Sequence, residues 1–282
     1  MVISNAKKAV LALIIANMIW GAAAPVFKWA LSDIHPYTLA FLRFSVPLIL
    51  MYPFVRKKLK VNKKDFLNII FIGITGIGIN IIFFFQGLLH APSINASLIG
   101  SSGPIFIIFY SLLFLKEKPK RKLLLGAPIG LFGVILVLIT PLFINGSLVA
   151  IGNVFYLIAM LGAITSILIT RKAAKRNSPE SITFWSFLVG SIVFLPFFIN
   201  EVNHFGFLQN LDIRGIIGLI FGILLSSLAA YFLHNWALKY LAAADVSVFT
   251  YIDPVMAILI AAPLLSEYPD TAFIFGTFFV LG

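Results

Sequence analysis

The sequence predicts an all-α membrane protein: a bundle of ten transmembrane helices, built from two inverted five-helix repeats, with the tenth helix truncated. The chain of 282 residues is 61% hydrophobic and 11% charged. About half of a typical soluble domain is apolar, so the excess is expected to face lipid. The apolar residues fall into runs of about 20, the length that crosses ~30 Å of hydrocarbon. The basic residues alternate between loops, and the two halves share landmarks.

Each apolar run is expected to form one helix, because short polar breaks separate it from the next. The last run stops at Gly282 after ~18 Å of helix, which is too short to span, so we expect a truncated tenth helix. No stretch resembles a soluble appendage. The expected spans are 9–31, 36–55, 66–89, 93–115, 121–140, 148–170, 180–200, 214–239, 244–265 and a partial one from 271.

The distribution of basic residues predicts a cytoplasmic N-terminus in the cell (inner) membrane, because cytoplasmic loops are rich in Lys and Arg. Of the 21 basic residues, Arg214 falls in an outer loop, and Lys28 and Arg43 fall within spans. The formal net charge of +11 therefore reports topology, and no nucleic-acid partner is expected. The remaining 18 are Lys7, Lys8, Arg56, Lys57, Lys58, Lys60, Lys63, Lys64, Lys116, Lys118, Lys120, Arg121, Lys122, Arg171, Lys172, Lys175, Arg176 and Lys239.

The N-terminus also imitates a signal peptide, since Lys7-Lys8 and an apolar run precede Ala22-Ala23-Ala24. However, the apolar run continues to Leu31, and removing the first helix would invert the parity of the charged loops. We therefore expect the first helix to be retained.

The two halves, 1–140 and 141–282, are expected to be repeats of five helices each. Because five is odd, the second half enters the membrane with the opposite polarity. Such inverted repeats are typical of secondary transporters, whose site lies between the halves. The landmarks Ser97, Pro104, Glu117 and Gly126 recur 150 positions later as Ser247, Pro254, Glu267 and Gly276, and Pro36 recurs as Pro179.

A family resemblance follows from the order and spacing of several short motifs. They are Trp20-Gly21 with Lys28, Pro36 to Arg43, Pro104 to Glu117, and Asp253-Pro254 to Glu267. Together they resemble the EamA family of the drug/metabolite transporter superfamily over nearly the whole chain. The resemblance implies ten helices around a central cavity and transport of metabolites, often export of amino acids or related compounds.

Charged residues within spans are the first candidates for function, because burying charge in a membrane is costly. Asp253 lies ~14 Å deep by helix rise and either faces a cavity or bonds to a neighbouring helix. Arg43 either forms an ion pair or binds an anionic group of the solute. Lys28, nearer the membrane surface, is expected to extend its ammonium group to the interface. Trp20 and Tyr251 are central aromatics that either line the cavity or pack against helices.

Uncharged polar residues form a second group of candidates, although many such residues merely bridge helices. Thr250 and Asp253 share a helix face, as do Ser97 and Ser101, and we expect these two faces to meet across the repeat interface. Asn80 completes the expected substrate-binding set. Prolines inside helices break a backbone hydrogen bond, so Pro104 and Pro254 are expected hinges. Other polar residues within spans are Gln86, Ser102, His234 and Asn235.

Several kinds of chemistry have no support in the sequence. It contains no cysteine and no phosphate-binding loop, and the four histidines are scattered, so no metal, cofactor or nucleotide hydrolysis is expected. The leading hypothesis is a secondary transporter of a small solute, in contact with membrane lipid. The alternatives are a membrane enzyme acting on lipid-linked substrates, which would favour an interfacial acidic or His cluster, and a channel.

Overall fold

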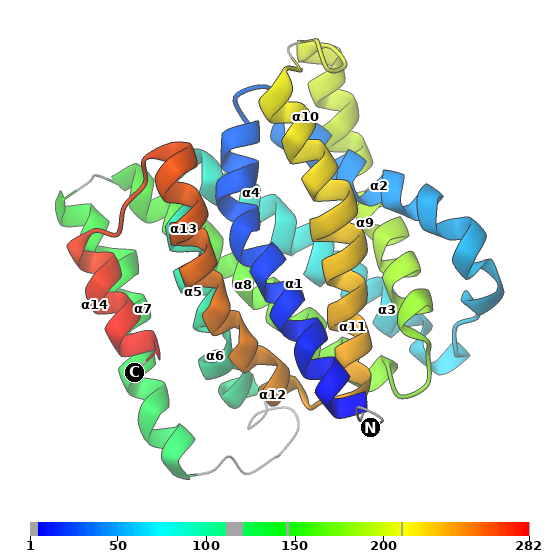
Figure 1. Ribbon diagram of the computed structural model, residues 1–282, viewed down its shortest axis with the longest axis horizontal. Helices are drawn as coiled ribbons and strands as arrows, with labels where there is room; N and C mark the ends of the chain where they lie inside the picture. Colours follow the sequence, from blue (N-terminus) through cyan, green and yellow to red (C-terminus); the bar gives the residue numbers. More distant parts are fainter. Residues whose placement is uncertain (1–4, 111–120, 145–146, 210, 282) are drawn as a thin grey trace.

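A computed structural model describes residues 5–110, 121–144, 147–209 and 211–281, so the expected landmark Glu117 lies outside it. The described part of the chain is helical and contains no strand (Figure 1). The expected all-α membrane fold is confirmed, whereas the count of ten spans stays a prediction. Seven helical stretches are long and apolar enough to cross a membrane: Asn5–Ala30, Pro36–Lys58, Lys63–His90, Ser147–Ala173, Pro179–Phe205, Ile213–Tyr240 and Asp245–Leu265. Two further apolar helical stretches are shorter than these spans: Pro128–Phe143, which is part of a longer helix, and Thr271–Val280.

Several long helices run without interruption. These are α1 (Asn5–Ala30), α2 (Pro36–Val55), α7 (Arg121–Ile144), α8 (Ser147–Ala173) and α9 (Pro179–Phe205), followed at the end of the chain by the shorter α14 (Thr271–Leu281). Two short 3₁₀ turns, η1 (Arg56–Lys58) and η2 (Lys63–Asp65), connect α2 to the next helix.

The other spans change helix type along their length. Two spans contain a π-helical stretch in the middle: α3 (Phe66–Gly73), η3 (Ile74–Ile79) and α4 (Asn80–His90) form one, and α10 (Ile213–Ile220), η5 (Phe221–Ala229) and α11 (Ala230–Tyr240) form the other. π-Helical turns are rare and are often found at functional sites.

Two further helices are interrupted next to a proline, because proline lacks the N–H that would continue the backbone ladder. One consists of α5 (Ser93–Ser101) and α6 (Gly103–Tyr110), with Pro104 in the first turn of α6. The other consists of α12 (Ala243–Ser247), the 3₁₀ segment η6 (Val248–Ile252) and α13 (Asp253–Leu265), with Pro254 in the first turn of α13. The interruptions lie where bends were expected, and a hinge function stays a prediction.

The helices of the two halves pack against each other. α1 lies beside α11 and α13, and α8 lies beside α4 and α5 (Figure 1). The two halves also meet where α2 packs on α9 and where α7 packs on α14. Each half therefore contributes a helix, α1 or α8, to the surroundings of the other, and a space between α1 and α8 is bounded by both halves.

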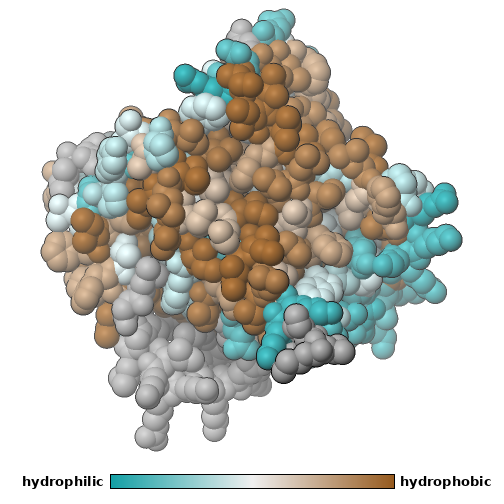
Figure 2. Space-filling model, in the orientation of Figure 1, coloured by the Kyte–Doolittle hydropathy of each residue, from teal (hydrophilic) through white to brown (hydrophobic). Residues whose placement is uncertain are grey.

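The outer surface is apolar over most of its height, as a lipid-facing surface must be. Figure 2 shows brown side chains across the middle of the molecule and teal ones at the right, where Figure 1 draws the loop between α2 and α3. Large apolar side chains such as Phe54, Phe143 and Phe278 are more than two-thirds exposed. Burying them in lipid instead of water is favourable, so the fold is that of a multi-pass membrane protein.

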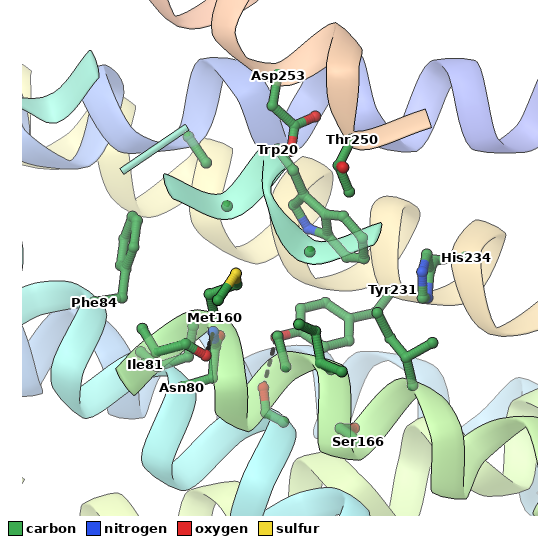
Figure 3. A pocket seen from close by; sticks show the side chains of 18 of the residues that line it. Trp20, Asn80, Ile81, Phe84, Met160, Ser166, Tyr231, His234, Thr250 and Asp253 are labelled. Carbon is green, nitrogen blue, oxygen red and sulfur yellow. Dashed lines mark hydrogen bonds between the residues drawn. The ribbon is translucent and has the colours of Figure 1, made fainter. Parts of the chain in front are cut away.

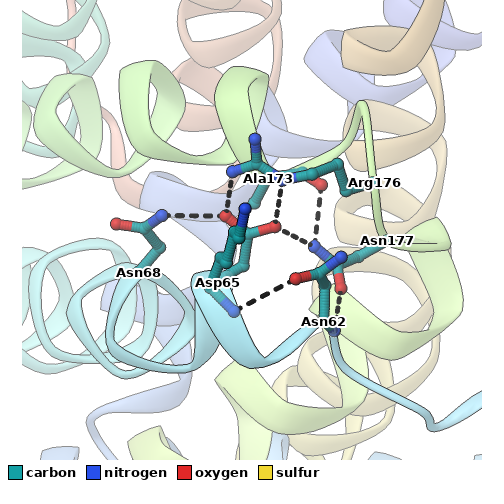
Figure 4. Close-up of polar contacts among 7 residues, drawn as sticks. Asn62, Asp65, Asn68, Ala173, Arg176 and Asn177 are labelled. Atoms are coloured by element: carbon teal, nitrogen blue, oxygen red, sulfur yellow. Dashed lines mark hydrogen bonds and ion pairs between the residues drawn. The ribbon is translucent and has the colours of Figure 1, made fainter.

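Polar contacts join the α2–α3 connection to the α8–α9 loop (Figure 4). Asp65 is fully buried and accepts hydrogen bonds from Arg176 Nε (2.8 Å), from Asn177 Nδ2 (2.9 Å) and from Asn68 Nδ2 (3.0 Å). Asn177 Oδ1 in turn accepts from the backbone N–H of Asn62 at 2.8 Å. The hydrogen bond to the Asp65 carboxylate raises the pKa of the Arg176 guanidinium above its usual range. We call Asn62, Asp65, Asn68, Arg176 and Asn177 the loop clasp.

We predict that Asp65→Ala destabilises the fold by about 1–3 kcal/mol, because it removes hydrogen bonds to a charged group and leaves the buried amide of Asn177 without that acceptor. The measurement is thermal unfolding of the purified protein in detergent. Lys58→Ala is the matched control: it breaks an exposed 2.6 Å ion pair with Glu180, which is worth at most ~1 kcal/mol. Equal losses from both variants would contradict a structural role for the clasp.

Candidate functional site

A cavity of about 240 Å³ lies between α1 and α8 and is bounded by helices of both halves. Its volume is close to the lower end of the ~300–1,000 Å³ range typical of small-molecule sites. Most of its wall is apolar. The polar or aromatic residues with a hydrogen-bonding group that line it are Asn17, Trp20, Arg43, Asn80, Ser97, Tyr156, Ser166, Thr170, Ser186, Ser226, Tyr231, His234, Asn235, Ser247, Thr250 and Asp253.

Six of the eight side chains expected to bind substrate lie in this wall, namely Trp20, Arg43, Asn80, Ser97, Thr250 and Asp253. The other two lie outside it. Ser101 is fully buried, and its hydroxyl donates to the carbonyl of Leu98 within the same helix at 2.8 Å. Tyr251 is half-buried in η6. The hinge candidates Pro104 and Pro254 also lie outside the cavity wall, beside the helix interruptions.

Trp20 lies at the centre of an aromatic group in the cavity (Figure 3). Its ring centroid is 5.3 Å from that of Tyr231, edge to face, and 5.0 Å from that of His234. Its indole N–H donates to the backbone carbonyl of Ser226 at 3.1 Å. Ser226 belongs to the π-helical stretch η5, so the irregular backbone of that segment holds the indole ring in place.

Arg43 is a buried cation without a carboxylate partner. It is 2% exposed, and none of the described carboxylates lies within ion-pair distance of it. Its Nη2 donates to Ser226 Oγ at 2.9 Å and its Nε to Ser227 Oγ at 3.2 Å. The guanidinium also lies 4.5 Å from the ring centroid of Phe27 and 4.9 Å from that of Phe44. Hydroxyls and aromatic rings stabilise a buried cation only partly.

Asp253 begins α13 at a point where α1 approaches it closely. A Cβ added to Gly21 of α1 would lie 2.9 Å from the Cα of Asp253 and 2.8 Å from its carbonyl oxygen, so only glycine fits there. Figure 3 shows Asp253 and Thr250 on the same side of the cavity, next to Trp20. Oδ1 of Asp253 is buried and has no hydrogen-bond partner among the described residues.

The expected meeting of two polar faces is found in part. α5 packs against α13 and η6, and Ser97 lines the same cavity as Thr250 and Asp253, whereas Ser101 does not. On the opposite wall, Asn80 at the start of α4 donates from Nδ2 to the carbonyl of Ala159 in α8 at 2.8 Å.

Lys28 has a specific partner, whereas its expected extension to the interface stays a prediction. Its ammonium group forms a 2.9 Å ion pair with Glu267 and donates to the carbonyl of Ala91 at 2.7 Å. Glu267 Oε2 also accepts from the backbone N–H and the hydroxyl of Ser93, at 2.7 and 2.6 Å, which caps the N-terminus of α5. Ser266 adopts a left-handed conformation (φ 53°) that ends α13 and turns the chain to Glu267. This contact ties α1, α5 and α13 together at one end of the cavity.

Several cavity residues could not be selected from the sequence. Asn17, Ser186 and the pair Ser226-Ser227 lie in apolar runs, and nothing in their spacing separates them from residues that bridge helices. Tyr231 lies in an apolar run, and no sequence pattern distinguishes it from the residues around it. His234 and Asn235, which the sequence placed only in the second group, both line the cavity.

Comparison with known proteins gives a consistent result. The sequence model of the EamA-like transporter family matches residues 7–139 and 150–282. An uncharacterized transporter of Archaeoglobus fulgidus is 25% identical over 269 residues, which cover 94% of this chain and 91% of that protein. The pseudopaline exporter CntI of Pseudomonas aeruginosa is 23% identical over 228 residues, 78% of this chain and 79% of the exporter. A crystal structure with 16% identity superposes with a TM-score of 0.69, covering 98% and 94% of the two chains, and supports the fold alone.

We predict that Arg43→Met leaves thermal stability unchanged within ~1 kcal/mol or raises it, because an apolar side chain of similar length removes an uncompensated buried charge. The unbonded hydroxyls of Ser226 and Ser227 offset part of that gain. Phe44→Ala, a large-to-small change in the core beside Arg43, is the control and is expected to cost about 3–5 kcal/mol. A comparable loss in Arg43→Met, measured by thermal unfolding in detergent, would make Arg43 a structural residue.

Proposed function

Because the chain belongs to the EamA-like transporter family, and is thus a transporter and not an enzyme, we propose that it is a secondary carrier of small metabolites. In this proposal it exports an amino acid or a related compound by alternating access around the central cavity. The observation that carries the proposal is the cavity between α1 and α8, whose wall is drawn from both halves of the chain. The similarity to an exporter of a small molecule, pseudopaline, supports the same class of activity.

The proposal includes ten transmembrane helices in two inverted repeats, 1–140 and 141–282. The two separate matches to the same family, 7–139 and 150–282, support this division. Shared irregularities support it as well: the third helix of each half contains a π-helical stretch, and the fourth is interrupted beside a proline. α7 and α14, the fifth helices, pack against each other.

We assign the cavity-lining residues Trp20, Arg43, Asn80, Ser97, Thr250 and Asp253 to substrate binding, and Ser101 and Tyr251 to its immediate support. Arg43 would contact an anionic group of the solute, and Trp20 would pack on its apolar part. Pro104 and Pro254 would act as hinges, since the interrupted helices α5–α6 and α12–α13 have lost backbone hydrogen bonds that would otherwise resist bending. A channel is the weaker alternative, because the cavity residues of the two halves differ and form no polar ring.

We predict a cytoplasmic N-terminus in the cell (inner) membrane. The chain has no cysteine, so a single introduced thiol reports the side on which it is exposed. Ser147→Cys should react with an impermeant maleimide from outside the cell and Lys175→Cys only after permeabilisation. Both residues are exposed, at the beginning of α8 and in the loop that follows it. The opposite labelling pattern would overturn the orientation.

We predict that Asp253→Asn inserts and folds normally but lowers transport at least tenfold, about 1.4 kcal/mol, because it removes a charge from the solute pathway. The assay is counterflow in liposomes with a panel of radiolabelled amino acids and other metabolites. Asp245→Asn is the control: Asp245 is an exposed carboxylate of the preceding helix segment, outside the cavity wall. Parental transport by Asp253→Asn would contradict the site, and transport of no compound by the parental protein would contradict the function.

A further inference from the structure

Asn17 presents an unused hydrogen-bond acceptor in the cavity wall. Its side-chain amide donates from Nδ2 to the carbonyl of Leu13 at 2.8 Å. The amide oxygen cannot take that place, because two acceptors do not bond, and this fixes the orientation of the group. Oδ1 has no hydrogen-bond partner among the described residues, although the residue is only 1% exposed. Leaving such an acceptor unpaired in a buried site is unfavourable.

Thr250 likewise presents only acceptor capacity. Its single hydroxyl proton is donated to the carbonyl of Ser247 at 2.7 Å, which leaves the lone pairs of Oγ1 facing the cavity that the residue lines. Asp253, one helical turn further along, has Oδ1 without a partner. Ser97 of α5 shows the same pattern, since its hydroxyl donates to the carbonyl of Ile94 at 2.6 Å.

Three of these acceptors, Asn17, Thr250 and Asp253, lie along the contact between two helices. α1 and the α12–η6–α13 helix run in the same direction (Figure 1) and touch through Gly21 and Asp253. Asn17 is four residues before Gly21 and therefore lies one turn away on the same face. η6, which carries Thr250, also packs on α1. We call Asn17, Thr250 and Asp253 the acceptor seam.

We propose that the acceptor seam binds a cationic amine group of the transported solute, with Asn17 as a specificity-determining residue. This inference rests on the proposed transport function and names part of the chemistry of its substrate. A primary ammonium group carries three donors and no acceptor, so it matches a wall that offers acceptors and one carboxylate. The guanidinium of Arg43, held by Ser226 and Ser227, supplies the donors at a different point of the cavity.

The test uses three compounds with the same apolar body. L-Leucine has an amine and a carboxylate, 3-methylbutylamine has only the amine, and 4-methylpentanoate has only the carboxylate. The affinity of each compound for the purified full-length protein is measured by the quenching of tryptophan fluorescence. The effect of each compound on transport of the radiolabelled panel is measured in liposomes. Asn17→Leu, which keeps the branching of the side chain and removes the acceptor, is expected to weaken binding of both amines about tenfold and to change binding of 4-methylpentanoate less than twofold.

The control is Asn153→Leu, which also replaces a buried asparagine inside a span. Asn153 lies outside the cavity wall and is bonded at both ends, to Asn95 at 3.0 Å and to the carbonyl of Val137 at 2.8 Å. We expect it to lower thermal stability without changing the ratio of the three affinities.

Two results with these compounds would overturn the inference. In one, Asn17→Leu weakens the amines and the carboxylate equally, so that Asn17 only supports the shape of the cavity. In the other, the parental protein binds neither amine while it transports another metabolite of the panel, which leaves the transport function standing. Sodium-dependent quenching without any amine, lost in Asn17→Leu, would also reject it in favour of a metal-cation site.

Discussion

The hydrocarbon core of the membrane offers no water to a polar group, and this constraint governs where the fold departs from simple helices. Every backbone N–H and C=O at that depth needs a partner within the protein. Several described helices are continuous, whereas the π-helical stretches η3 and η5, the 3₁₀ segment η6 and the proline interruptions all occur in helices that border the cavity. Irregular backbone is tolerated there because it is covered by neighbouring helices or faces the cavity itself.

The same constraint separates two kinds of charged residue. Asp65 and Arg176 in the loop clasp, and Lys28 and Glu267 at the end of α1, are paired and bonded to several neighbours, as a structural role requires. Arg43 and Asp253 both line the cavity and pair with neither each other nor any other described charge. Charges held in this way reduce stability, and the solute contact proposed above would account for their presence. The paired charges lie in the loop clasp and near the end of α1, whereas the charges in the cavity wall keep hydrogen-bonding capacity without a charged partner.

The all-α membrane fold could be predicted from the sequence, because the length of the apolar runs follows directly from membrane thickness. The position of Asp253 and Arg43 in the cavity wall could be predicted for the same reason, because charges at that depth are too costly to face lipid. The partner of Lys28 could not be predicted, since Glu267 lies 239 positions away and only the packing of α1 on α13 brings them together. Asn17 was missed because hydropathy treats an isolated asparagine as a minor break in an apolar run. Whether Oδ1 or Nδ2 stays free depends on local bonding that no sequence pattern records.

The π-helical stretches η3 and η5 change the direction in which the side chains beyond them point around the helix axis. An α-helix advances ~100° per residue, and a wider turn advances less, so the helix beyond each stretch is rotated relative to a regular continuation. A helical wheel drawn through 66–90 or 213–240 as one α-helix would therefore assign the wrong face to residues after the stretch, including Asn80 and Tyr231. Both nevertheless line the cavity together with Gly76 and Ser226, which lie within the stretches. Any residue-by-residue scan along either span should be indexed separately on each side of the wide turn.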